Sequence, residues 1–369
     1  MTPGVYLVTQ YLDASKALLD KRLSNRPAPF ALVNERNRET FVAADVARHL
    51  IAFQDAPEVI MPRRVLATEL QAFCHTINTL LDDLADEIVS SIPSGGRLDF
   101  VEVVAIPFAV RAMCQIFGFP ERDASQIKAW SEPFFSLFHA IPDRATLLGM
   151  NATLEEFRSY VTCAIEDRRA APRDDLLTML AGADADTLDG EALVDNTMLL
   201  VADAIENVWA GIANALVLLI ENYQVTDEYL NAGGNWFDIV DECLRLESPS
   251  QYQGRIALEP MKIGDTVLSK YAVLLVGFAA ANRDPSAFED PEVFRPGRKG
   301  PRHLAFGLGR HACIGGTLVR METASILSAL WPLIPNLEIE QASLQWNARA
   351  GHRWLKGLPI RHRAWHTTT

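Results

Sequence analysis

The chain has 369 residues, of which 49% are hydrophobic and 22% are charged, and its formal net charge is −13. This balance indicates a folded globular protein with a large core and excludes a disordered chain. Because phosphate backbones are bound by basic surfaces, the negative charge argues against nucleic acid as a partner.

The five cysteines are an odd number without paired spacing, which favours a reducing compartment over a disulfide framework. The first residues carry no basic-then-apolar targeting signal, and the longest apolar runs are too short for a membrane span. We therefore expect a cytoplasmic protein without a membrane partner. No internal repeat or linker divides the sequence, so residues 1–369 are predicted to form a single domain.

Helices dominate the predicted elements. A strand is expected at residues 5–9, followed by a helix at 13–23 with Asp13 or Ser15 as its cap. Amphipathic spacing predicts three more long helices, at 65–92, 99–117 and 154–169.

The second half of the chain adds a central helix and most of the strands. Residues 188–222 are mostly apolar, which predicts a helix buried through the centre of the molecule. Strands are expected at 254–256 and 261–268, and the tail 354–360 suggests a terminal hairpin. The expected fold class is therefore mainly α with a minor β part.

The most specific pattern lies at residues 303–316, which read His-Leu-Ala-Phe-Gly-Leu-Gly-Arg-His-Ala-Cys-Ile-Gly-Gly. Gly307 and Gly309 allow the backbone to take positive φ and to approach a large flat group. Cys313 precedes a helix expected from residue 317, whose N-terminus should lower the thiol pKa. A thiolate suits an iron centre, whereas the simplest alternative is a small buried hydrophobic cysteine.

The spacing of this segment resembles the haem-ligand loop of the cytochrome P450 family at every defined position. The matching residues are Phe306, Gly307, Gly309, His311, Cys313 and Gly315. The resemblance covers roughly residues 4–362, with an N-terminus shorter than is usual for the family. It implies the cytochrome P450 fold, with haem b (iron protoporphyrin IX) between the long central helix and this loop. It also implies that Cys313 ligates the iron as a thiolate, and that Phe306, Gly307 and Gly315 help to form the haem site.

Glu242 and Arg245 share one face of a predicted helix, where a surface ion pair of little value is the ordinary interpretation. Both also resemble the family's Glu-x-x-Arg element. The resemblance implies that they form a buried structural triad with Arg298, which supports the loop beneath the haem.

The resemblance further implies cationic partners for the two haem propionates. His311, Arg255 and Arg63 match the family's positions for this role, while a histidine of the family pattern is replaced by Val59. One propionate contact is therefore expected to be lost or supplied elsewhere.

On the central helix, residues 203–207 (Asp-Ala-Ile-Glu-Asn) resemble the family's Ala-Gly-x-Glu/Asp-Thr segment. Glu206 is retained, and Asn207 replaces the threonine that helps to deliver protons, so these two residues are the predicted catalytic pair. An amide is a poor proton donor, so Asn207 is expected to make the protein a poor or substrate-assisted monooxygenase. The predicted substrate pocket contains Val201, Ala202, Ile205, Ser250 and Trp354.

The resemblance implies a monooxygenase that oxidises a small organic molecule in secondary metabolism, as a monomer, with electrons from a ferredoxin or flavodoxin and its reductase. Arg295, Lys299 and other cations near the loop are the expected docking surface. Two alternatives remain open. One is a haem-thiolate enzyme of atypical class (oxidative coupling, rearrangement or peroxide-driven chemistry), and the other is a haem-binding protein without turnover.

Overall fold

The computed structural model describes residues 4–138, 143–183, 188 and 190–363. Helices form most of it and the strands are short, which confirms the expected fold class. The α-helices are α1 (Tyr11–Leu19), α2 (Val42–His49), α3 (Ile60–Cys74), α4 (Asn78–Ser90), α5 (Ile106–Phe117), α6 (Ala124–Phe135), α7 (Arg144–Ala170), α8 (Leu176–Ala181), α9 (Gly190–Glu221), α10 (Tyr223–Asn231), α11 (Trp236–Leu246), α12 (Phe278–Ala281) and α13 (Gly316–Leu330).

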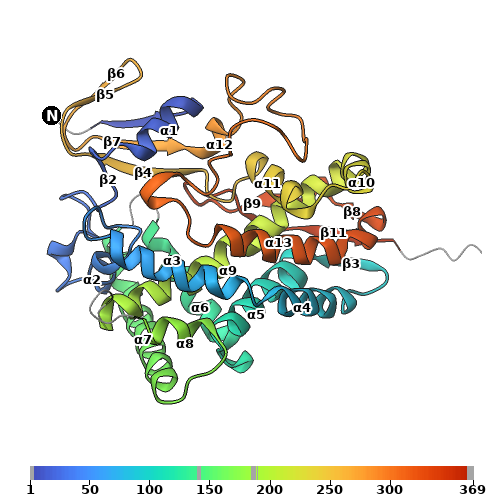
Figure 1. Cartoon of the computed structure of the whole chain (residues 1–369), viewed down its shortest axis with the longest axis horizontal. Helices are drawn as coiled ribbons and strands as arrows, with labels where there is room; N and C mark the ends of the chain where they lie inside the picture. The colour runs from blue at the N-terminus through green and yellow to red at the C-terminus, as the bar shows by residue number, and fades with distance from the viewer. Residues whose placement is uncertain (1–3, 139–142, 184–187, 189, 364–369) are drawn as a thin grey trace, which may run out of the picture.

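Most strands lie near the ends of the chain or between α11 and α12, and one lies between α4 and α5. The strands are β1 (Val5–Val8), β2 (Leu23–Ser24), β3 (Gly96–Asp99), β4 (Tyr252–Ala257), β5 (Met261–Ile263), β6 (Thr266–Leu268), β7 (Val273–Gly277), β8 (Leu337–Ile339), β9 (Gln345–Trp346), β10 (Leu355–Gly357) and β11 (Pro359–His362). The largest sheet has the order β1-β7-β4-β2, in which β1 and β7 are parallel and the other pairs are antiparallel. This sheet packs with α1 and α12 at one end of the molecule, above the helical part (Figure 1).

Several predicted boundaries shift for local reasons. The first helix begins at Tyr11, so Asp13 and Ser15 lie inside it and the predicted cap is wrong. The long stretch 65–92 is two helices, α3 and α4. The break follows Cys74, where the Thr76 hydroxyl donates a hydrogen bond back to the Phe73 carbonyl at 2.8 Å and competes with the helical pattern.

The predicted terminal hairpin is also wrong. β10 pairs with β9, which precedes it in the chain, whereas β11 pairs with β3 and β8. Asp99 holds the turn between β10 and β11, because its carboxylate accepts the Leu358 N–H at 3.0 Å. A side chain at Gly357 would meet this carboxylate, since a Cβ there would lie 2.3 Å from an Asp99 oxygen.

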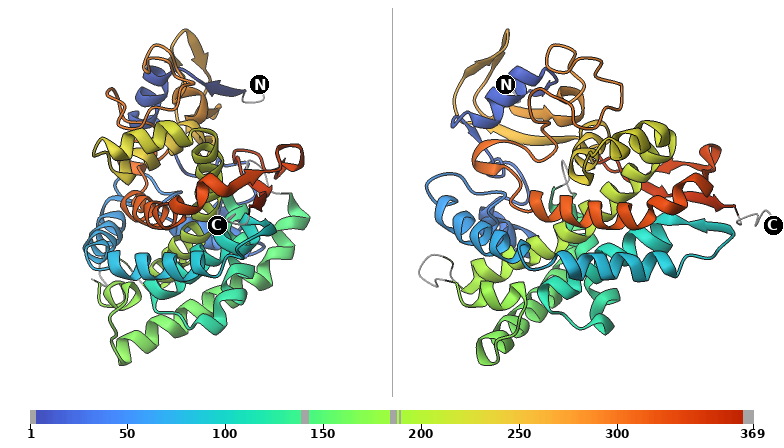
Figure 2. Two further views of the ribbon diagram at one scale, coloured as in Figure 1. Left: turned by 90° about the vertical axis from the view of Figure 1, so that its right-hand side faces the viewer. Right: turned by 45° about the vertical axis from the view of Figure 1, so that its right-hand side comes forward.

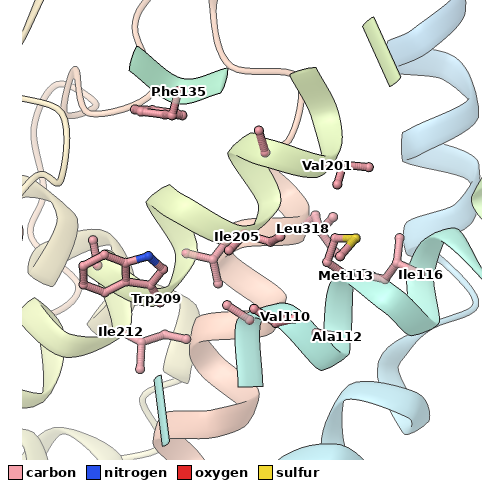
Figure 3. Packing of buried hydrophobic residues seen from close by; sticks show 14 of the residues in the cluster. Val110, Ala112, Met113, Ile116, Phe135, Val201, Ile205, Trp209, Ile212 and Leu318 are labelled. Atoms are coloured by element: carbon pink, nitrogen blue, oxygen red, sulfur yellow. The ribbon is translucent and has the colours of Figure 1, made fainter. Parts of the chain in front are cut away.

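Helix α9 is the central helix that the sequence predicts. It packs against α5, α6, α7 and α13, and crosses the middle of the helical part in each view (Figures 1 and 2). Among the described residues it is the one helix long and apolar enough to cross a membrane, but 67% of its most apolar stretch is buried inside the protein, as expected of a core helix. Figure 3 shows Val201 and Ile205 of α9 against Val110 and Met113 of α5.

Candidate functional site

The loop before α13 presents Cys313. The Cys313 N–H donates to the Phe306 carbonyl at 2.7 Å, which closes the segment between them into a compact loop. Gly307 and Gly309 have φ of +64° and +74°, so the predicted positive φ is confirmed at both. At Gly309 the close approach is to α1, because a Cβ there would lie 2.7 Å from Leu19 Cδ2.

The Cys313 thiol does not have the lowered pKa that its helix N-terminus predicts. Burial raises the pKa of this thiol to about 11, and the charge of Asp203 adds to the rise. Three groups lower this pKa: the Gly315 N–H, which donates a hydrogen bond to the sulfur, and the cations Arg63 and Arg320. Desolvation therefore exceeds the helix effect in the free thiol, and a metal ion would supply the missing stabilisation of a thiolate.

Cys313 lies in a recess of the protein, since its side chain is exposed and yet burial by the surrounding atoms raises its thiol pKa. Opposite it, α9 shows a matching pattern. Between Leu193 and Leu216 its residues are buried except at Leu200, Asp203, Ala204 and Asn207, which keep partial exposure at the spacing of one helix face. We call the space between this face of α9 and Cys313 the central hollow.

The predicted pocket residues on α9 lie beside this face. Val201, Ala202 and Ile205 are fully buried in the hydrophobic core, and Figure 3 shows Val201 and Ile205 directed at α5. Each of them is next in the sequence to a residue of the partly exposed row. Its side chain therefore points about 100° away from that neighbour around the helix axis. The structure therefore places them in packing contacts and does not bring them together with Cys313.

The remaining two predicted pocket residues lie near the tail. Trp354 is buried and its ring centroid lies 5.2 Å from that of Phe135 and 5.5 Å from that of Trp209. Ser250 is half-buried and forms an isolated β-bridge with His352.

The predicted catalytic pair divides between two faces of α9. The Glu206 carboxylate accepts hydrogen bonds from Lys128 at 2.8 Å, Ser131 at 2.6 Å and Trp209 at 3.1 Å, and the side chain is buried. Asn207 faces the central hollow, where its Oδ1 is buried without a hydrogen-bond partner. Glu206 is thus held between α9 and α6, away from the row that contains Asn207.

Asp203 is the residue of the site that the sequence prediction missed. Its carboxylate has one close polar neighbour among the described residues, the Asn207 amide nitrogen at 3.5 Å. Burial raises the pKa of Asp203 to about 7. The signal was present in the sequence, because an acid four residues before Asn207 on an apolar helix must share its face.

Cations without carboxylate partners line the other side of the loop. Arg255 is 2% exposed, and its guanidinium donates to the Gly254 carbonyl at 2.9 Å and to Gln253 Oε1 at 3.0 Å. Arg63 donates to the Ala312 carbonyl. Within the described ranges, neither arginine pairs with a carboxylate.

His311 completes this group. Its Nε2 is buried without a hydrogen-bond partner. Burial lowers the pKa of His311 to about 4, and the positive charges of Arg255, Arg310 and Arg63 contribute to this decrease. Val59, which replaces the family's histidine, is fully buried at the start of α3. Buried cations and donors require anionic partners, so Arg63, Arg255 and His311 fit the two propionates of haem.

The predicted triad is assembled. The Glu242 carboxylate accepts two hydrogen bonds from Arg245 at 2.8 Å, and one oxygen also accepts from Arg298 at 3.3 Å and from the Arg295 backbone N–H at 2.8 Å. Glu242 and Arg245 are 4% and 2% exposed. The surface-pair interpretation is therefore wrong, since all of these groups are screened from water.

Comparisons with known proteins agree with this geometry. A family model described as cytochrome P450 matches residues 238–331. The chain is 26% identical over 371 residues to the polyketide biosynthesis cytochrome P450 PksS of Bacillus subtilis (strain 168), covering 97% of this chain and 89% of the relative. It is 28% identical over 370 residues to the cytochrome P450 monooxygenase PikC of Streptomyces venezuelae, covering 97% and 85%.

The solved structures show the same similarity in three dimensions. The crystal structure of P450BioI in complex with an acyl carrier protein that carries hexadec-9Z-enoic acid superposes with a TM-score of 0.85. Sequence identity is 25%, and the match covers 97% of this chain and 92% of that chain.

Proposed function

We infer that this chain is a bacterial-type member of the cytochrome P450 family, a haem-containing oxidoreductase of the monooxygenase type, and we propose that Cys313 holds the iron of haem b. One observation carries the proposal. Cys313 opens onto the central hollow from one side, the polar face of α9 borders it from the other, and unpaired cations lie beside the loop. We propose that residues 1–369 form one cytochrome P450 domain.

In this proposal, different residues of the chain bind the propionates, form the loop around the sulfur and support that loop. Arg63, Arg255 and His311 bind the propionates, and Phe306, Gly307 and Gly315 shape the loop around the sulfur. Glu242, Arg245 and Arg298 are structural and hold the segment that precedes the loop. When bound, haem supplies the activation of dioxygen, from which one oxygen atom enters the substrate. Asn207 borders the hollow with a partly exposed side chain, whose amide holds a water molecule or a polar group of the substrate.

The reaction belongs to secondary metabolism, as for relatives named for polyketide biosynthesis. The substrate is a small organic molecule, and electrons arrive from a redox partner. We propose a ferredoxin or flavodoxin with its reductase as this partner, and a monomeric, cytoplasmic enzyme. Arg295, Lys299 and Arg302 are exposed near the loop and form the proposed docking surface, whereas Arg298 and Arg310 point inward to protein partners.

The test is NADPH and dioxygen consumption with a surrogate ferredoxin and ferredoxin reductase, in the presence of a panel of macrolactones and fatty acids. Hydroxylated product formed in proportion to NADPH supports a monooxygenase. Product formed only with added peroxide supports the atypical reaction class, and haem binding without any product supports a binding protein. The ratio of product to NADPH in Asn207→Thr tests the amide, because a hydroxyl there should raise coupling with apolar substrates.

A further inference from the structure

We propose that the Asp203 carboxyl is the proton donor of the central hollow, and that it gives its proton to the oxygen atom that leaves as water. The proposal rests on the proposed monooxygenase function and assigns a residue to one of its steps. It places the acid one turn before Asn207, on a different face of α9 from Glu206.

The geometry of α9 directs Asp203 at the reacting side. Asp203, Ala204 and Asn207 are partly exposed while the neighbouring residues of the helix are buried, so this row borders the central hollow. The charge of Asp203 raises the pKa of the Cys313 thiol, so the carboxyl lies near enough to the sulfur to interact with it. An acid on α9 opposite the proposed metal ligand lies on the side where the reaction occurs.

The other acid of this segment is already engaged. Glu206 accepts hydrogen bonds from Lys128, Ser131 and Trp209, so both of its oxygens are engaged by donors on α6 and α9. Releasing a proton to the hollow would require Glu206 to leave all three donors. Asn207 cannot release a proton, because an amide N–H is not acidic. On the described part of α9, Asp203 is therefore the one acid that faces the hollow.

The surroundings of Asp203 keep its proton available near neutral pH. Burial alone raises its pKa to about 7, with no contribution resolved from any charged neighbour. A general acid is most effective when its pKa is close to the working pH. The charged and titratable groups placed around the hollow are Cys313 and His311 in the loop, Arg63 on α3, Arg255 on β4 and Arg320 on α13, with Glu206 of α9 and Lys128 of α6 on the far side.

Asn207 completes the arrangement. Its amide nitrogen lies 3.5 Å from Asp203 Oδ1, and its own oxygen is buried without a partner. Since the two ends of an amide are interchangeable by rotation, Asn207 can donate to the ionised acid or accept from the protonated acid. It therefore positions the carboxyl in both protonation states.

Insertion of one oxygen atom into the substrate consumes two electrons and two protons for each dioxygen molecule. The electrons come from the reduced redox partner, and the protons come from the protein and solvent. The O–O bond of dioxygen breaks, one oxygen enters a C–H bond of the substrate as a hydroxyl group, and the other leaves as water. Asp203 provides a proton to the departing oxygen and regains one from solvent. Without that proton the O–O bond persists, and the electrons leave as hydrogen peroxide.

The first test measures the protonation state of the Asp203 carboxyl. Difference infrared spectra of the haem-loaded protein between pH 5 and pH 9 should show the carbonyl band of a protonated carboxyl that disappears as the pH rises. This band should be absent in Asp203→Asn and present in Glu228→Gln, a control that removes an exposed carboxylate on α10. A band unchanged by Asp203→Asn would overturn the proposal.

The second test needs no knowledge of the substrate. Electrons from NADPH are supplied through a surrogate ferredoxin and its reductase in aerated buffer without added substrate. Dioxygen then accepts either two electrons and two protons to form hydrogen peroxide, or four electrons and four protons to form two water molecules once the O–O bond breaks, and peroxide is measured against NADPH. Loss of a general acid slows its step by about 100-fold or more, so Asp203→Asn should send nearly all electrons to peroxide at every pH. In the wild type the peroxide fraction should rise as the pH increases through about 7. Asp203→Glu should restore both the low peroxide fraction and its pH dependence.

Equal peroxide fractions in wild type and Asp203→Asn at pH 6, in preparations with equal haem content, would refute the assignment. If Asp203→Asn does not retain haem, a pH-independent peroxide fraction in wild type and Asp203→Glu would refute it. Because neither experiment measures a hydroxylated product, failure of the monooxygenase proposal with every substrate would be seen separately.

Discussion

The Lys128 ammonium donates a hydrogen bond to the Glu206 carboxylate at 2.8 Å, which joins α6 to the centre of α9. Glu206 is 1% exposed, and Ser131 and Trp209 provide its other donors. An acid that the sequence suggests for catalysis thus has a structural contact on a different face of α9 from Asp203 and Asn207. The face that borders the hollow carries Asp203 and Asn207.

Lys128→Met should destabilise the protein, because it leaves the buried Glu206 carboxylate without its counter-charge. Lys128 is 22% exposed on its side chain, so the expected loss is below that of a fully buried pair, about 1–3 kcal/mol in the free energy of unfolding. Urea titration measures it. Adding Glu206→Gln should recover part of the loss, and an unchanged midpoint in Lys128→Met would contradict this role.

Glu242→Ala should be more damaging, because it leaves Arg245 and Arg298 without the carboxylate that both contact. The expected cost is about 3–5 kcal/mol, seen as little soluble haem-loaded protein. Asp13→Ala is the matched control, since the Asp13–Lys16 pair on α1 is partly exposed and 4.0 Å apart, and should cost less than about 1 kcal/mol. A well-folded Glu242→Ala protein with full haem content and no turnover would instead assign Glu242 to catalysis.

Asp203→Asn should change how stability depends on pH. The pKa of Asp203 is raised from 3.8 to about 7 in the folded chain, so the native state binds a proton that the unfolded state has already lost between these values. The contribution of this group to the free energy of unfolding therefore falls as the pH rises towards 7 and is constant above.

Asp203 keeps partial exposure, so water reduces this penalty. From pH 5 to pH 8, Asp203→Asn should gain roughly 1–2 kcal/mol relative to wild type. Urea titrations at the two pH values measure the difference. An equal difference between the two proteins at both pH values would show that the carboxyl titrates outside this range.

Arg255→Met should speed the loss of haem. Burial lowers the pKa of Arg255 to about 10, and within the described residues it has no carboxylate partner, as expected of a group that binds a ligand anion. Losing one charge-assisted hydrogen bond of about 1.5–3 kcal/mol should increase the rate of haem transfer to apomyoglobin by about 10- to 100-fold. Arg361→Met, at an exposed arginine on β11, is the control and should leave this rate unchanged. Equal rates in the two variants would remove Arg255 from the propionate site.

The sequence predicted the elements that carry a strong local pattern. The central helix, the strand expected at residues 5–9 and found as β1, and the positive φ of Gly307 and Gly309 were all expected from residue types alone. The triad of Glu242, Arg245 and Arg298 was expected from the resemblance, and its hydrogen bonds are present. These features depend on spacing along the chain or on a segment with many fixed positions.

The features that the sequence did not predict depend on packing between distant segments. The tail strands pair with β3, β8 and β9, which no local turn signal could indicate. The pKa of Cys313 depends on how deeply the loop is enclosed. On α9, either the face with Val201 or the face with Asp203 could border the hollow. The sequence does not reveal which face does so, because the helix is apolar nearly all round.

The most direct test of the central claim is the absorption spectrum of the reduced carbon monoxide complex in wild type and Cys313→Ser. A haem thiolate formed by Cys313 predicts the long-wavelength band for which the family is named in the wild type, and its loss in the variant. A wild-type band at the position of a histidine-ligated haem, or a long-wavelength band that persists in Cys313→Ser, would contradict the account.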